Sequence, residues 1–224
     1  AFRFARGEEV KSNTGQMAKL KRPLDWMVIT DHSDGMGTIN EIRAGNPEMV
    51  SDPFLKHMYE AMNSNDPEKA AAATMELISL QSTGKLPKQL MDPRWMVSAW
   101  QKTAEIADKY NDPGKFSALI GYEWTPNPGG GDNLHRNVIY RDGADLAVQE
   151  LPLTTFQTMD PEKLWDWMEK YEVKTGGKLL AIPHNGNLSN GRMFEETTFS
   201  GGPLTKSYAE TRQKWEPLFE LTQT

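Results

Sequence analysis

The stretch Val28–Gly35, VITDHSDG, decides the fold, because an apolar run stops there at an acid beside a histidine. The lead-in Trp26–Ile29, WMVI, is apolar at every position, so both of its alternating faces are apolar. That pattern is typical of a short strand covered on both sides by helices. In open α/β sheets and α/β barrels, functional groups gather just beyond the carboxyl ends of such strands. The stretch therefore predicts a buried strand that delivers Asp31 and His32 to a site.

The composition indicates one domain with a substantial core. The chain has 224 residues, of which 38% are hydrophobic and 25% are charged, and we expect a single domain over residues 1–224. A net charge of −6 argues against nucleic acid as a partner, because phosphate binding needs a clustered positive surface. No apolar run approaches the roughly 18 residues of a membrane-spanning helix, so we expect no membrane partner.

From both ends of the chain we expect a piece of a longer protein, although a processed or trimmed chain would have the same ends. The start, AFRFARGEEV, reads as an amphipathic helix entered partway, and the end predicts a strand at Leu218–Leu221 that then stops. The compartment stays open, since a targeting signal could lie upstream of Ala1.

Apolar runs alternate with helical patterns along the chain. The helices are expected after Asp92-Pro93 and Asp160-Pro161, where an aspartate N-cap precedes a proline in the first turn. This alternation predicts an α/β architecture. The runs that predict strands are WMVIT ending at Thr30, FSALIGYEW ending at Trp124, RNVIYR starting at Arg136, LLAIPH ending at His184, and PLFEL near the C-terminus.

The span from about residue 36 to 91 interrupts this alternation. It holds helical patterns that begin at Asp52-Pro53 and Asp66-Pro67, and it contains no convincing strand. Connections between a strand and a helix usually take about 2–6 residues, so the span predicts a helical insertion. A lid over the strand ends and a plain surface insertion are equally consistent with it.

Metal-capable side chains recur at the strand ends. Glu123 lies near the end of the second run, and His184 ends the fourth. His135 precedes its strand, but the connection from Trp124 is too short for a crossover helix, so we expect an antiparallel pair. The start of one strand then lies beside the end of the previous strand. Glu123 and His135 should therefore converge.

Taken singly, His32, His135 and His184 are each equally consistent with a metal ligand and with a hydrogen-bonded core residue. Taken together, and beside Asp31 and Glu123, they predict a metal site. The chain has no cysteine, so a metal must be held by imidazole, carboxylate or amide groups. Imidazole with carboxylate suits divalent zinc, manganese or iron, and a water activated by such a metal is a nucleophile near neutral pH. His57, in the middle of a helix of the insertion, is expected to be structural or solvated. The candidate metal ligands are His32, Glu123, His135 and His184, with Asp31 beside them.

A polar loop, HNGNLSNGR, follows the last of these histidines. Such a cluster suits a small anionic or sugar-like substrate, with Arg192 as the anion clamp. A hydrogen-bonded loop rich in turn residues explains the same composition, and both readings stay open. The candidate substrate-binding residues are Asn185, Asn187, Asn190 and Arg192.

Three segments resemble a known family: LDWMVITDHSDGMG, FSALIGYEWTPNPGGGDNLHRNVIYRD and LAIPHNGNLSNGRMF. They are similar to domain of unknown function 3604, a group related to the PHP (polymerase and histidinol phosphatase) metal-dependent phosphoesterases. The resemblance covers nearly the whole chain. It implies a distorted seven-stranded β/α barrel with up to three metal ions at the carboxyl ends of its strands.

The resemblance also implies roles for individual residues. The family's Thr-Asp-His motif falls on Thr30, Asp31 and His32, with the histidine as a ligand and the aspartate just outside the ligand set. The metal-bridging glutamate falls on Glu123, and two further histidine ligands fall on His135 and His184.

The sequence departs from the family pattern at both ends. The family begins with a His-x-His ligand pair, which is absent here, and ends with an Asp-x-His pair that the chain does not reach. We therefore expect a PHP-like distorted β/α barrel that is incomplete at both ends. An open sheet edge would allow self-association.

The expected function is metal-dependent hydrolysis, most simply of phosphoesters, by a metal-activated water. Catalytic roles then fall on Asp31, Glu123 and Arg192. Two alternatives remain open. One is hydrolysis of another ester or an amide by the same site, and the other is an inactive domain that only binds a metal or a ligand.

Overall fold

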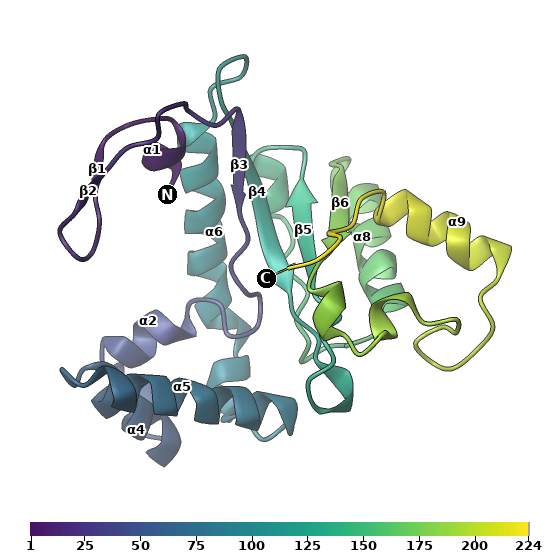
Figure 1. The fold of residues 1–224 in the computed structure, drawn as a ribbon. Helices are drawn as coiled ribbons and strands as arrows, with labels where there is room; N and C mark the ends of the chain where they lie inside the picture. Colours follow the sequence, from purple (N-terminus) through teal and green to yellow (C-terminus); the bar gives the residue numbers. More distant parts are fainter. Residues whose placement is uncertain (224) are drawn as a thin grey trace.

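The main sheet has four strands, in the order β3-β4-β5-β6, and it is open at both edges (Figure 1). The computed structural model describes residues 1–223. β3 runs parallel to β4, whereas β4 pairs with β5 and β5 with β6 in antiparallel fashion. A separate hairpin joins β1 to β2. The strands are β1 (Val10–Lys11), β2 (Met17–Ala18), β3 (Trp26–Ile29), β4 (Ser117–Trp124), β5 (Arg136–Tyr140) and β6 (Leu179–Pro183).

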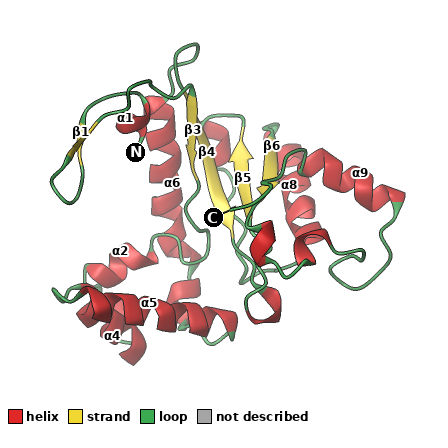
Figure 2. Cartoon of the chain, in the orientation of Figure 1, coloured by secondary structure: helices red, strands yellow, loops and turns green. Residues whose placement is uncertain are grey.

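Two long helices, α6 and α8, connect the strands and lie against the sheet (Figure 2). Both begin as expected, with the carboxylates of Asp92 and Asp160 accepting from backbone N–H groups of the first turn. The helices are α1 (Phe2–Ala5), α2 (Thr38–Arg43), α3 (Pro47–Val50), α4 (Pro53–Met62), α5 (Pro67–Ser82), α6 (Pro93–Tyr110), α7 (Ala144–Ala147), α8 (Pro161–Thr175) and α9 (Lys206–Trp215). The 3₁₀ turns are η1 (Lys88–Met91), η2 (Pro128–Gly130), η3 (Gly186–Leu188) and η4 (Arg192–Phe194).

The predicted PHP-like distorted β/α barrel is wrong. Among residues 1–223 the main sheet has four strands, and its edge strands β3 and β6 do not pair with each other. The expected barrel has seven strands, and closing a β/α barrel takes about that number or more with matched tilt and stagger. The protein is therefore a mixed α/β structure with an open four-stranded sheet and a small two-stranded one.

The strand predicted at Leu218–Leu221 is also absent. This segment has no regular secondary structure, and among the described residues its backbone hydrogen bond to the sheet is the one from Glu220 N to the carbonyl of Pro183, at 2.9 Å. A single bond does not make a ladder, so β6 remains an edge strand.

The core lies on one face of the sheet. Side chains at alternate positions of β4, such as Ile120 and Tyr122, are 2% and 0% exposed and pack under α6 and α8. The burial expected on both faces of β3 is wrong, because the Trp26 residue is 57% exposed. The opposite face of the sheet carries the alternate set, which includes Glu123.

Gly121 marks a place where β3, β4 and β5 approach closely. A Cβ there would lie 2.7 Å from Val28 Cγ2 and 2.8 Å from the backbone oxygen of Val138. We expect Gly121→Ala to destabilise the fold by about 1–3 kcal/mol, because a methyl group would overpack this contact. Denaturant unfolding measures the effect, with Gly186→Ala, whose Cβ has only ordinary contacts from 3.7 Å, as the tolerated control. Equal stability of the two variants would contradict the prediction.

The span of about residues 36–91, predicted to be a helical insertion, contains α2–α5 and η1 and has its own small core around Ile42, Leu55 and Met58. Asp34 joins it to the rest of the molecule. Its carboxylate accepts from Gln81 Nε2 of α5 at 2.7 Å and from the backbone N of Thr155, also at 2.7 Å. Figure 1 shows the insertion at the end of the sheet to which β3 points.

None of the helices within residues 1–223 has both the length and the apolar run needed to cross a bilayer.

Candidate metal centre

Glu123, His135 and His184 converge on one point. Glu123 Oε1 lies 3.1 Å from His135 Nδ1 and 3.1 Å from His184 Nε2. The three ligand atoms all lie within 4.8 Å of one another. Their side chains are 13%, 10% and 10% exposed, so the cluster is largely shielded from solvent.

The sheet register brings these residues together. Antiparallel pairing places Glu123 of β4 opposite Asn137 of β5, two residues from His135. His184 directly follows β6, and its backbone N donates to the carbonyl of His135 at 3.2 Å. The expected antiparallel pair and the convergence of Glu123 with His135 are confirmed. Three strand ends thus supply one carboxylate and two imidazoles to the same edge of the sheet.

The cluster is electrostatically coupled. Burial by itself raises the pKa of Glu123, but the facing imidazoles of His135 and His184 and the nearby His32 outweigh it and lower the pKa to about 2. Burial likewise favours a lower pKa for His184, but the Glu123 carboxylate outweighs it, so the pKa of His184 is raised. Glu123 is therefore an anion throughout the physiological range, and it attracts positive charge to this point.

The donor set fits a divalent metal ion. Nitrogen and oxygen ligands sit about 2.0–2.2 Å from a tetrahedral zinc ion, which separates neighbouring ligands by about 3.3–3.6 Å. The two 3.1 Å distances are slightly shorter than this, so a bound zinc ion would move the imidazoles from Glu123 by a few tenths of an ångström. His184 Nε2 is buried and has no hydrogen bond of acceptable geometry to any described residue. A divalent metal ion held at this point would give that ring nitrogen a partner. Imidazole and carboxylate together suit zinc, manganese or iron without selecting among them.

His32 and Asp31 lie at the border of the cluster. His32 Nδ1 is 3.7 Å from Glu123 Oε2 and 2.9 Å from Thr125 Oγ1, and its side chain is 63% exposed. His32 pairs with Glu123 in a parallel bridge just beyond β3. Asp31 is exposed, and its backbone oxygen accepts from Glu123 N at 2.9 Å. The sequence places both residues at the right strand end, but the tight cluster does not include them.

The four candidate substrate-binding residues have partners within the protein. Asn187 Nδ2 donates to the backbone oxygen of Gln223 at 2.9 Å, and Asn190 donates to Asp132. Arg192 donates to Asp132 Oδ2 at 3.1 Å and lies 3.4 Å from Glu195 Oε1. Asn185 Nδ2 lies 3.4 Å from His135 Nδ1. Of the four, Asn185 is therefore the one in direct contact with the cluster formed by Glu123, His135 and His184.

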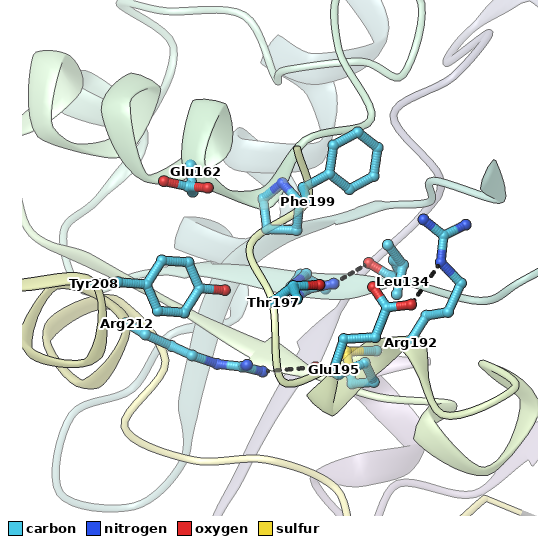
Figure 3. A pocket seen from close by; sticks show the side chains of 11 residues that line it. Leu134, Glu162, Arg192, Glu195, Thr197, Phe199, Tyr208 and Arg212 are labelled. Atoms are coloured by element: carbon cyan, nitrogen blue, oxygen red, sulfur yellow. Dashed lines mark hydrogen bonds and ion pairs between the residues drawn. The ribbon is translucent and has the colours of Figure 1, made fainter. Parts of the chain in front are cut away.

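Arg192 also borders a small recess beside α8 and α9. Figure 3 shows Arg192 joined to Glu195, with Arg212, Tyr208 and Glu162 on the opposite side. The recess has a volume of about 20 Å³, which is room for about one water molecule. It is too small to hold a substrate.

A larger cleft, of about 520 Å³, separates the insertion from the main body. Met36, Met96 and Trp167 are among its lining residues, and none of the three cluster residues is. It therefore lies apart from the candidate metal centre.

Asn127 and Gln223 contact the cluster, and Thr125 contacts the neighbouring His32; none of the three was among the candidate site residues. Asn127 Oδ1 lies 3.0 Å from His135 Nε2, Thr125 bonds His32, and Gln223 Oε1 lies 3.3 Å from His184 Nδ1. The only available signal was a polar residue, Asn127, between two prolines in the loop that links Glu123 to His135.

Metal affinity is expected to fall as the pH is lowered from about 8 to about 6, because His184 must lose its proton to bind a metal. Its raised pKa lets the proton compete at a higher pH than an ordinary histidine allows. Competition titration of zinc at several pH values measures this. An affinity that stays constant over the range would contradict it.

A family model described as "Protein of unknown function (DUF3604)" matches residues 1–224. No curated protein and no solved structure matches the chain.

Proposed function

Since the chain belongs to the DUF3604 family, whose description assigns no activity, we propose its function from the site: it is a metal-dependent hydrolase that acts on phosphoesters. The observation that carries the proposal is the convergence of Glu123, His135 and His184 within 4.8 Å. A divalent metal held there supplies Lewis acidity, which activates water near neutral pH and stabilises negative charge that develops on the substrate.

The protein's own residues hold and charge this site. Glu123 contributes an oxygen that faces both imidazoles, and its lowered pKa keeps it ionised. The second ring nitrogen of each imidazole contacts an amide oxygen: His135 Nε2 contacts Asn127 Oδ1, and His184 Nδ1 contacts Gln223 Oε1. Asp31 and His32 are exposed at the border of the cluster, and this exposure supports a role in contacting a substrate that approaches from solvent.

Two arguments support phosphoesters as the substrate class. The first is the similarity of Thr30-Asp31-His32, Glu123, His135 and His184 to the PHP phosphoesterase pattern. The second is the polar loop that follows His184, which places Asn185 beside the cluster. Arg192 contributes less directly, because Asp132 and Glu195 already balance its charge. Hydrolysis of a carboxyl ester by the same centre is the enzymatic alternative.

The test is metal retention followed by an ester panel. The chain is stripped with a chelator, equilibrated with zinc or manganese and desalted, and its metal content is measured by plasma mass spectrometry. Hydrolysis of nitrophenyl phosphate, bis(nitrophenyl) phosphate and nitrophenyl acetate is then compared. We expect at least one metal equivalent and a preference for the phosphoesters.

The matched variants are His184→Ala and His57→Ala. His57 lies on α4 and pairs with Glu76 across the surface of the insertion, at 3.9 Å, so its loss should leave both readouts unchanged. His184→Ala should lose both metal and turnover. Retained metal with no turnover on any ester would instead favour an inactive metal-binding domain, and a preference for the acetate would favour the alternative enzyme.

A further inference from the structure

We propose that Asn127 and Gln223 are positioning residues that fix the two ligand imidazoles in opposite tautomers, so that His135 binds the metal through Nδ1 and His184 through Nε2. The inference rests on the proposed metal centre and adds which ring nitrogen serves as each ligand. It also makes the last residues of the described chain part of the centre.

Asn127 sets the tautomer of His135. Its amide orientation follows from its other contact, because Asn127 Nδ2 donates to the backbone oxygen of Thr125 at 3.0 Å. Asn127 Oδ1 therefore faces His135 Nε2, at 3.0 Å. A carbonyl oxygen only accepts, so Nε2 carries the proton. The lone pair remains on His135 Nδ1, the nitrogen that lies 3.1 Å from Glu123 Oε1.

Gln223 sets the tautomer of His184 in the opposite sense. Gln223 Oε1 lies 3.3 Å from His184 Nδ1, so this nitrogen carries the proton and donates it. The lone pair of His184 is then on Nε2, the buried atom that faces Glu123 Oε1 at 3.1 Å without a hydrogen bond. Metal-ligating histidines usually donate their second N–H to such an acceptor, which orients the ring and raises its basicity.

Gln223 is itself held by Asn187. The Gln223 backbone N donates to Asn187 Oδ1 at 3.0 Å, and Asn187 Nδ2 donates to the Gln223 backbone oxygen at 2.9 Å. This reciprocal pair fixes the backbone that carries the Gln223 amide. Asn187 thus acts on the centre through Gln223.

Glu220 anchors the same segment one step earlier. Its backbone N donates to the carbonyl of Pro183, and its Oε2 accepts from the backbone N of Asn185, both at 2.9 Å. Residues 220–223 therefore lie along the end of β6 and the loop that follows it. Glu220 contacts the two residues that flank His184 in the sequence, Pro183 and Asn185. The segment forms no strand, yet its contacts converge on the ligand.

The experiment measures zinc affinity and ring-nitrogen assignment in the full chain. Asn127→Ala and Gln223→Ala should each weaken zinc binding by about 10–100-fold. Asn127→Asp and Gln223→Glu, which keep an acceptor oxygen, should restore most of it. Asn63→Ala and Gln149→Ala are the controls, because these amides donate only to backbone carbonyls remote from the centre, and they should bind like the original chain.

Nitrogen-15 NMR of the zinc-loaded chain gives the second readout. We expect the zinc-bound nitrogen to be Nδ1 in His135 and Nε2 in His184, with His57, on the surface, as the unbound reference. The reverse assignment, or alanine variants that bind zinc as tightly as the controls, would overturn the inference while leaving the metal centre standing. If the unaltered chain binds no zinc, the proposed function and this inference fall together.

Discussion

Glu123→Gln is expected to reduce zinc or manganese affinity by more than about 100-fold, beyond the 10–100-fold typical of residues that only orient a ligand. Glutamine has nearly the same size, so the change removes the charge and little else. Glu123 is the single carboxylate within the tight cluster of described residues, and its Oε1 faces both ligand imidazoles at 3.1 Å. Calorimetric titration of the metal-stripped chain measures the effect.

A second substitution at Glu123 separates the effect of its charge from the effect of its geometry. Glu123→Asp keeps the charge but withdraws it by one methylene from the two histidines, and we expect an intermediate loss of affinity. Glu76→Gln, on the surface of α5, is the matched control, since Glu76 pairs only with the exposed His57. If Glu123→Gln retains metal as well as Glu76→Gln does, then Glu123 is not a ligand and the proposed centre is incorrect.

Glu216→Ala is expected to lower the free energy of unfolding by about 3–5 kcal/mol, because it leaves a buried charge without its partner. Glu216 Oε1 accepts from Arg136 Nε at 3.0 Å, and the two side chains are 1% and 2% exposed. Trp165 Nε1 donates to the same oxygen at 2.9 Å, and Arg212 Nε donates to Oε2 at 3.1 Å. This network joins β5, α8 and α9.

Glu210→Ala is the control on the same helix. Glu210 pairs with Lys206 at 3.6 Å, but the side chains are 64% and 89% exposed, and such surface pairs are worth about 0–1 kcal/mol. For a chain of this size the expected loss at Glu216 corresponds to a melting temperature lower by about 6–20 °C. Equal unfolding free energies for the Glu216 and Glu210 variants would contradict the prediction.

A double variant tests the cause of that loss. Arg136→Met with Glu216→Leu removes both buried charges and replaces them with apolar side chains of similar size. Such replacements are often neutral or stabilising. We therefore expect the pair to recover a large part of the stability. The remainder comes from the unpaired Trp165 N–H and from Arg212, which loses its Glu216 partner. A double variant as unstable as Glu216→Ala would show that packing, and not the uncompensated charge, accounts for the loss.

Local sequence patterns were sufficient for the elements of the main sheet. Four of the predicted strands are present as β3–β6, because apolar alternation records which side chains a sheet buries. The caps at Asp92 and Asp160 are present because a carboxylate satisfies the free N–H groups of a first helical turn wherever the helix lies. The loop after Trp124 was short enough to require an antiparallel pair. The approach of Glu123 to His135 followed from that pair.

Other features depended on contacts between distant segments. The run PLFEL is apolar like the other strands, yet it forms a single backbone hydrogen bond to β6 and is no strand. Trp26 is apolar like its neighbours, yet it is exposed at an edge of the sheet. An apolar residue is buried only if another element covers it, and a local pattern does not contain that information. For the same reason the distorted β/α barrel expected from the family resemblance is not formed.

The sequence by itself determined which residue types stand at the strand ends, and hence that Glu123, His135 and His184 are candidates for one metal centre. The tertiary structure alone decided that these three form the tight cluster while His32 stays at its border. The tertiary structure alone also placed Asn127 beside His135 Nε2 and Gln223 beside His184 Nδ1. The physical reason is how far apart the contacting residues lie along the sequence. A strand end is set by neighbours a few residues away, whereas the hydrogen bond between His184 and Gln223 joins residues 39 apart, and only the folded chain brings them together.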